Sequence, residues 1–211
     1  MKDIAKLKVM AALTAASVGV LIVSNIAAVK LWDFFGIPVD GGIIIFPLSY
    51  VINNLTSELY GRKMANRIVV IGLTMNILAV LVFLLVGILP SYSGWDGQAS
   101  YDAILGFTPR IVIASVLSYL VSGLINNFVF EKIRKKLGEK KMFIRFLGSS
   151  VVARIFDSLI FETIAFFGVL SVPEFLVQAG FAYIAGVAVE LLLFPVSRIV
   201  AKRLKKYEIR G

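Results

Sequence analysis

The chain has 211 residues, of which 59% are hydrophobic, and its mean hydropathy is +0.90. Soluble domains are about 45–50% apolar, so this composition indicates an integral membrane protein. The sequence contains no Cys and no His, which excludes disulfides, thiolate and imidazole chemistry and the usual ligands of zinc and haem. We therefore expect a protein that is not an enzyme, with no catalytic residue, no cofactor and no metal.

Six apolar segments follow one another, each close to the about 20 residues that a helix needs to cross a bilayer. Basic residues before the first segment are typical of a signal peptide, but that segment is longer than a cleavable apolar region of about 7–15 residues. We expect an all-α fold, a single transmembrane domain over residues 1–211 built as a bundle of six transmembrane helices. The segments are residues 9–29, 43–59, 68–89, 110–130, 146–170 and 176–200.

The net charge of +9 indicates membrane topology rather than nucleic-acid binding. Most of the 22 Lys and Arg residues fall in the N-terminal tail, in the loops after the second and fourth segments, and in the C-terminal tail. Since positive residues mark cytoplasmic loops, we expect both termini on the cytoplasmic side. The expected partner is the lipid bilayer and not nucleic acid, and the sequence leaves open whether the chain forms a homo-oligomer.

The second segment is the most informative, because polar residues interrupt a run of membrane length. On a helical wheel Phe46, Tyr50, Asn53, Asn54 and Glu58 share one half, opposite an apolar half. Polar groups without partners are costly in hydrocarbon, so this half must face other helices or a wet cavity. We interpret the segment as one wall of a binding site.

The fourth segment carries a narrow polar stripe that includes Tyr119, Ser122 and Asn126 at helical spacing. Serines often serve only in helix–helix packing, which is the simpler interpretation of the stripe. The sequence around Asn126 also repeats an earlier motif: INNxxxE occurs at residues 52–58 and again at 125–131. Internal repeats are typical of transporters, with a chance match as the alternative.

The fifth segment places Ser150, Arg154, Asp157 and Glu162 on one face of a helix. A charge in the middle of a membrane helix costs about 2.5–3.5 kcal/mol on insertion scales, so these groups need partners. Arg154 and Asp157 are i,i+3 neighbours that could pair locally and merely lock the bundle. That pairing does not account for Glu162, nor for Glu190 in the sixth segment, so a cationic or hydrogen-bond-donating ligand is the competing interpretation.

Three stretches of the chain resemble the signature blocks of the queuosine precursor transporters, also called the vitamin-uptake-transporter family. They are IIIFPLSYVINNLTSELYGRKMA, FTPRIVIASVLSYLVSGLINNFVF and SSVVARIFDSLIFETIAFFG, and the resemblance extends from about residue 40 to residue 198. It implies a six-helix importer of 7-deazaguanine bases, the precursors of the tRNA nucleoside queuosine, in a bacterial cytoplasmic (inner) membrane. Glu58, Asp157 and the serines match the family pattern, whereas the family usually has Asp at Asn54 and Gln at Arg154.

We therefore predict an importer of a small heterocyclic base, bound between the second, fourth and fifth segments, with the sixth as a further candidate wall. A carboxylate, Asp157 or Glu58, would accept from the N–H donors of a guanine-like edge, and an amide or Arg would serve its acceptor. Aromatic rings would stack on the base. The predicted binding residues are Phe46, Tyr50, Asn53, Asn54, Glu58, Tyr119, Ser122, Asn126, Ser150, Arg154, Asp157 and Glu162.

Two alternatives remain at this level. The chain also has the size of a substrate-binding subunit of an energy-coupling-factor vitamin importer, and alanines at 11, 12, 15 and 16 would suit docking on a shared subunit. An intramembrane enzyme is disfavoured, because we find no nucleophile and base at a recognisable spacing. The sequence does not identify the base or the coupling ion.

Overall fold

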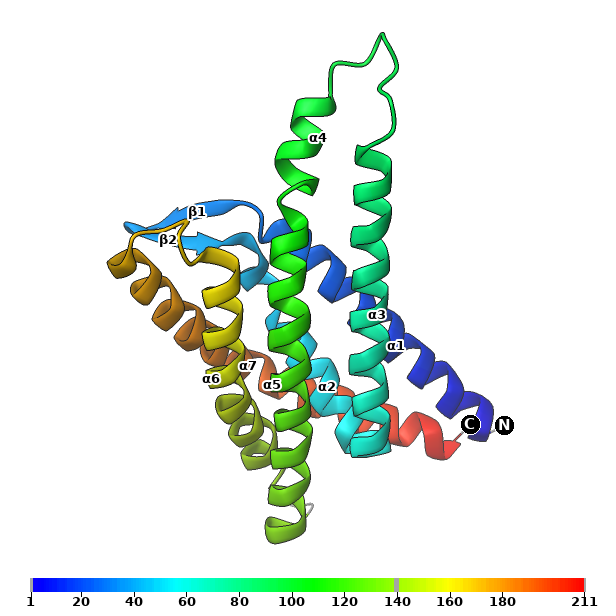
Figure 1. Ribbon diagram of the computed structural model, residues 1–211. Helices are drawn as coiled ribbons and strands as arrows, with labels where there is room; N and C mark the ends of the chain where they lie inside the picture. Colours follow the sequence, from blue (N-terminus) through cyan, green and yellow to red (C-terminus); the bar gives the residue numbers. More distant parts are fainter. Residues whose placement is uncertain (1, 139–140, 211) are drawn as a thin grey trace.

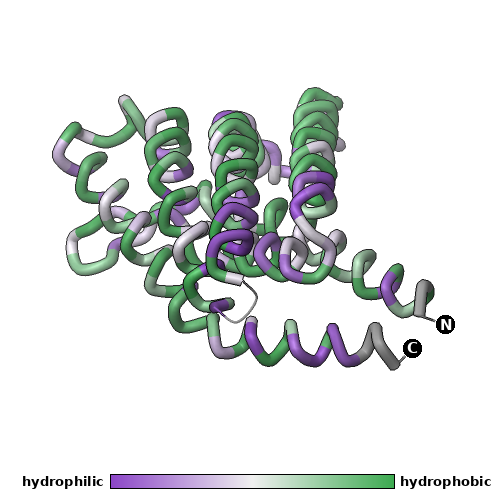
Figure 2. Tube along the Cα trace, turned by 90° about the horizontal axis from the view of Figure 1, so that it is seen from below, coloured by the Kyte–Doolittle hydropathy of each residue, from purple (hydrophilic) through white to green (hydrophobic). Residues whose placement is uncertain are grey.

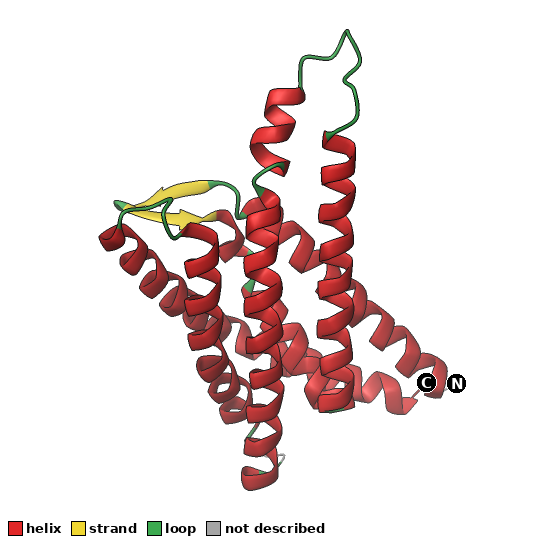
Figure 3. Cartoon of the chain, viewed as in Figure 1, coloured by secondary structure: helices red, strands yellow, loops and turns green. Residues whose placement is uncertain are grey.

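The computed structural model describes residues 2–138 and 141–210, and it is almost entirely helical (Figure 1). Long helices lie side by side, and one small hairpin sits at the end of the bundle opposite to both termini (Figure 3). The predicted predominance of helix is confirmed. The elements are α1 (Lys2–Ala27), β1 (Leu31–Phe34), β2 (Ile37–Asp40), the 3-10 helix η1 (Gly41–Ile44), α2 (Pro47–Tyr60), α3 (Arg62–Gly87), α4 (Gln98–Leu105), α5 (Thr108–Leu137), α6 (Met142–Phe166) and α7 (Val172–Arg210).

Among the described helices, four are long and apolar enough to cross a bilayer. They correspond to α1, α3, α5 together with α4, and α7. The helix α2 has 14 residues, about 21 Å at 1.5 Å per residue, which is shorter than the about 30 Å of hydrocarbon. The helix α6 has 25 residues but carries Arg154, Asp157 and Glu162 in its middle. The count of six spans therefore stays a prediction.

The second predicted segment does not form one continuous helix. Residues 43–44 belong to η1, and α2 begins only at Pro47, whose missing N–H is tolerated in the first turn. The helix ends at Tyr60, and the next residue, Gly61, adopts φ 78° before α3 begins at Arg62. Between the third and fourth predicted segments lies α4, which is held to α3 by a hydrogen bond from the Tyr101 hydroxyl to the Phe83 carbonyl at 2.8 Å.

A β-hairpin between α1 and η1 was not predicted. Its strands pair in antiparallel register, with Phe34 opposite Ile37. The two-residue loop is Phe35 and Gly36, both at positive φ (53° and 83°), as a type I′ hairpin turn requires. The hairpin places Asp40 at the start of η1, beside the bundle rather than in an exposed turn.

Many polar residues are buried in the bundle, and many large apolar residues are exposed along the helices, unlike the surface of a soluble protein. Leu81, Leu85 and Leu192 are exposed, whereas Asn54, Asn126 and other polar side chains are buried. Figure 2 shows apolar residues along the lengths of the helices and hydrophilic ones at the helix ends near the termini and along the end of α7. Such an arrangement is expected where hydrocarbon surrounds the bundle and polar groups must find partners inside it.

Candidate functional site

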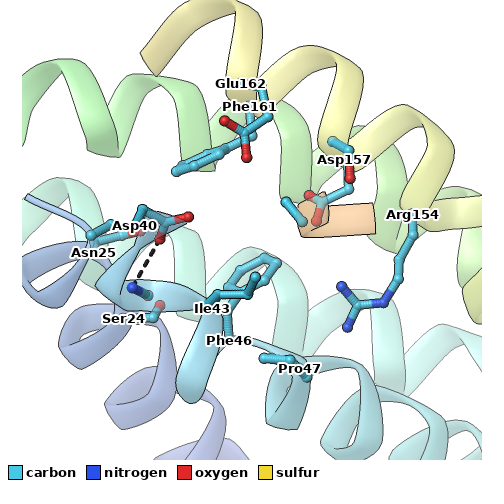
Figure 4. A pocket seen from close by; sticks show the side chains of 14 residues that line it. Ser24, Asn25, Asp40, Ile43, Phe46, Pro47, Arg154, Asp157, Phe161 and Glu162 are labelled. Atoms are coloured by element: carbon cyan, nitrogen blue, oxygen red, sulfur yellow. Dashed lines mark hydrogen bonds between the residues drawn. The ribbon is translucent and has the colours of Figure 1, made fainter. Parts of the chain in front are cut away.

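A cavity lies near the hairpin end of the bundle, with about 500 Å³ of space between side chains when its open mouth is counted. It is bounded by the second half of α1, the segment from β2 to the start of α2, one face of α6, and α7. Figure 4 shows the α6 side chains along one side, with Asp40 and Phe46 across from them. The lining residues are Ser24, Asn25, Ala28, Asp40, Gly42, Ile43, Phe46, Pro47, Arg154, Asp157, Ser158, Phe161, Glu162 and Ala182.

Helical spacing explains the contribution of α6. Arg154, Asp157, Ser158, Phe161 and Glu162 follow at i, i+3, i+4, i+7 and i+8, which places them on one face. Four of the predicted binding residues thus line the cavity: Phe46, Arg154, Asp157 and Glu162. Their role in binding stays a prediction.

Asp40 is a lining residue that the sequence did not reveal. It is buried, and its Oδ1 accepts a hydrogen bond from the Gly42 amide at 2.8 Å. Gly42 is needed there, because a Cβ atom would lie 2.8 Å from the Ser24 carbonyl oxygen and from Asp40 Oδ1. Burial raises the pKa of Asp40 to about 6, and the backbone hydrogen bonds only partly oppose that shift. The carboxyl therefore titrates close to neutral pH.

Asp157 and Glu162 bring two more carboxyl groups to the cavity. Asp157 is buried and accepts a hydrogen bond from the Ser122 hydroxyl of α5 at 3.3 Å. Glu162 is 2% exposed, and its Oε2 has no hydrogen-bond partner among the described residues. Neither Asp157 nor Glu162 takes part in an ion pair within the described part of the chain. Together with Asp40, they make the cavity acidic and rich in acceptors.

Arg154 is engaged with α7. Its Nε donates to Glu190 Oε1 at 2.8 Å, Nη2 lies 2.8 Å from the same oxygen, and both side chains are buried. Its guanidinium carbon lies 4.5 Å from the centre of the Tyr50 ring, a cation–π contact. The local pairing with Asp157 that the sequence allowed is therefore not the one that the structure adopts.

Several polar residues of α2, α5 and α6 form a buried layer outside the cavity lining. Asn126 donates to Asn54 at 2.8 Å, and Asn54 donates to the Ser150 hydroxyl of α6 at 3.0 Å. Asn53 is buried, and neither of its amide atoms has a partner among the described residues. The repeated motifs therefore meet in space, and the layer ties three helices together.

The aromatic residues of the prediction form a cluster in which only Phe46 reaches the cavity. The rings of Phe46, Tyr50 and Tyr119 contact one another edge to face, with centroids 6.0–6.2 Å apart. Both tyrosines are buried. Phe161 of α6 supplies the second ring at the cavity, so two phenyl faces are available to a flat ligand.

Glu58 lies apart from the cavity. Its Oε2 is 2.8 Å from Arg145 Nη2, and its Oε1 is 2.8 Å from Lys205 Nζ, so both oxygens are engaged. Arg145 also donates to the Gly138 carbonyl at 2.6 Å. The group joins α2, α6, α7 and the end of α5, and a structural role explains it without a ligand.

Sequence reasoning missed the contributions of α1 and the hairpin. Ser24 and Asn25 lie in an otherwise apolar segment, and the amide of Asn25 donates to Asn76 of α3 at 2.7 Å. The adjacent polar residues Ser24 and Asn25 inside an apolar segment were the sequence feature that could have indicated a role for α1 in the site. No comparable signal existed for Asp40, because only the hairpin brings it against α1.

Comparison with known proteins gives a consistent result. The family model described as "Putative vitamin uptake transporter" matches residues 40–200. A "Probable queuosine precursor transporter" of Bacillus subtilis is 26% identical over 189 residues, which cover 88% of this chain and 81% of that protein. No solved structure matches the chain at a significant level.

Two further relatives carry similar names. A "Probable queuosine precursor transporter" of Haemophilus influenzae is 26% identical over 156 residues (72% of this chain, 64% of that protein). A "Queuosine precursor transporter" of Escherichia coli is 24% identical over 134 residues (64% of this chain, 58% of that protein). The chain thus spans less than two thirds of these two proteins.

Proposed function

The chain belongs to the putative vitamin uptake transporter family, and we propose that it imports a queuosine precursor, a 7-deazaguanine base, across a bacterial inner membrane. The observation that carries the proposal is the cavity itself. It combines two phenyl rings with three carboxyl groups, Asp40, Asp157 and Glu162, that form no ion pair among the described residues. A flat molecule rich in N–H donors complements such a lining.

The chemistry of a guanine-like base fits these groups. Its N1 and N2 atoms donate hydrogen bonds in nearly parallel directions, which one carboxylate can accept with both oxygens. Asp157 is the best placed, because it projects from the middle of α6 into the cavity and is held by Ser122. Phe46 and Phe161 would stack on the ring, and the amide of Asn25 or a lining hydroxyl would serve the O6 acceptor.

We further propose six spans with both termini in the cytoplasm. The charge distribution supports this orientation. Most residues of the short helix α2 are buried inside the bundle, whereas α6 exposes Ile155 and Leu159 and keeps its charged side chains buried. In this orientation the hairpin and the cavity mouth lie on the outer side. The base would enter there and leave past the ion pairs of Glu58.

Uptake by the purified protein alone in liposomes tests the proposal. We expect saturable uptake of labelled 7-deazaguanine base, competed by the unlabelled base and not by adenine. Comparison with and without a proton gradient decides the energy coupling. Binding without uptake would instead support the substrate-binding subunit of an energy-coupling-factor importer, which the names of the relatives do not favour. If the protein shows no binding and no uptake of the base, the assignment of the base as substrate is refuted.

A further inference from the structure

Arg154 has two carboxyl groups within reach of its position on α6, and the structure joins it to only one. Asp157 lies at i+3 on the same helix, where a local ion pair is ordinarily favourable. Glu190 lies on α7, and its Oε1 is 2.8 Å from both Nε and Nη2 of Arg154. Since Arg154 and Asp157 both line the cavity, the choice of partner decides the charge that a ligand meets there.

The guanidinium occupies a slot formed by Tyr50, Gly186 and Glu190. Gly186 lies one turn before Glu190 on the same face of α7. A Cβ atom at position 186 would lie 2.6 Å from Cζ of Arg154, and nearer still to Nη1, so the group rests directly on the helix backbone. The ring of Tyr50 covers it at 4.5 Å. A side chain at position 186 would therefore force the guanidinium to shift from its place beside Glu190.

With Arg154 in this slot, Asp157 forms no ion pair in the described part of the chain, although the charge of Arg154 still acts on it. The hydroxyl of Ser122 donates to it at 3.3 Å, and Ser118 and Tyr50 also interact with it, but hydroxyl donors do not neutralise a carboxylate. A buried guanidinium that lost Glu190 would be costly to leave unpaired, and Asp157 is the carboxyl nearest along its own helix.

We propose that Glu190 and Gly186 are positioning residues for substrate binding. They hold Arg154 in its ion pair with Glu190, so that Arg154 does not occupy the Asp157 oxygens and the carboxylate can accept the N–H donors of the base. The inference rests on the proposed function and adds to it the residues that set the charge of the site. Glu190 and Gly186 act through Arg154 and do not touch the ligand. It also assigns a role to the ion pair of α6 and α7 beyond holding the helices together.

Binding of a labelled 7-deazaguanine base to the full chain in detergent tests the inference. Glu190→Gln removes the charge that holds Arg154. We expect the affinity for the base to fall about tenfold or more, because Arg154 then pairs with Asp157 and the base loses its charge-assisted hydrogen bond to that carboxylate. Gly186→Ala keeps both charges but fills the slot, and we expect a loss in the same direction. It serves as the second variant where Glu190→Gln fails to fold.

Arg154→Gln separates positioning from stability. Breaking the pair from either side leaves a buried group unpaired, so a merely structural role predicts equal losses for Arg154→Gln and Glu190→Gln, in stability and in binding alike. We expect Arg154→Gln to lose stability as Glu190→Gln does, yet to bind the base about tenfold more tightly than Glu190→Gln. Adding Arg154→Gln to Gly186→Ala should recover most of the affinity that Gly186→Ala loses.

The outcomes keep the two proposals apart. Wild-type binding together with equal affinities for Glu190→Gln and Arg154→Gln would overturn the positioning role and leave the proposed function intact. Failure of the double variant to recover affinity would also overturn it. A folded wild-type protein that does not bind the base would overturn the proposed function and this inference with it.

Discussion

The side-chain amide of Asn126 donates a hydrogen bond to the Oδ1 of Asn54 at 2.8 Å, which joins the two INN motifs across α2 and α5. Both residues are buried. Polar contacts between membrane helices are worth about 0.6 kcal/mol on average and up to about 1.7 kcal/mol. We expect Asn54→Ala and Asn126→Ala to lower stability and to be less than additive in the double variant, measured by unfolding in mixed micelles. Strict additivity would show that the contact is not energetically coupled.

Replacing Asp157 by Asn should weaken binding of the base by about ten- to a hundredfold, because a hydrogen bond to a charged group contributes about 1.5–3 kcal/mol. Asn keeps the size of the side chain and an acceptor for the Ser122 hydroxyl, so the fold should be retained. Equilibrium binding and a thermal unfolding curve measure both effects. Ser122→Ala is the matched control, with a smaller expected loss, and unchanged affinity of Asp157→Asn would remove Asp157 from the site.

The stability of the protein should depend on pH through Asp40. Its pKa in the folded chain is raised from 3.8 to about 6 by burial, so folding favours the protonated form. The contribution of Asp40 to stability is therefore fully present below about pH 3.8 and is lost as the pH rises through about 6.

Asp40→Asn isolates this contribution, because the amide oxygen can still accept from the Gly42 N–H. Relative to the wild type, the variant should gain stability between pH 4 and pH 7, by an amount on the order of 3 kcal/mol. Thermal unfolding in detergent across this range measures the difference. A difference that is constant with pH would contradict the burial of the Asp40 carboxyl.

Glu58→Gln should destabilise the protein strongly. Arg145 is 0% exposed and would lose its charged partner, and breaking a buried ion pair costs about 3–5 kcal/mol. Lys205→Ala breaks the other ion pair of Glu58, but the Lys205 side chain is 41% exposed, so a loss of at most about 1 kcal/mol is expected. The variants are compared by expression yield and by the unfolding midpoint. A loss of stability for Lys205→Ala as large as that for Glu58→Gln would contradict the conclusion that Arg145 is the more important partner of Glu58.

The sequence by itself determined the helical class, the membrane character and the resemblance to the transporter family, because apolar length, charge placement and local motifs are properties of contiguous residues. It also identified the polar faces of the second, fourth and fifth segments, since helical periodicity relates residues three or four positions apart. Phe46, Arg154, Asp157 and Glu162 were found in this way, and they do line the cavity.

Only the tertiary structure decided which of these groups meet. The pairing of Arg154 with Glu190 spans 36 residues and depends on the space that Gly186 leaves on another helix. Asp40 reaches the cavity only because the hairpin folds against α1. Glu58 lies outside the cavity and forms ion pairs with Arg145 and Lys205. Sequence periodicity gives the direction in which a side chain points from its own helix, whereas its partner is fixed by the packing of the other helices.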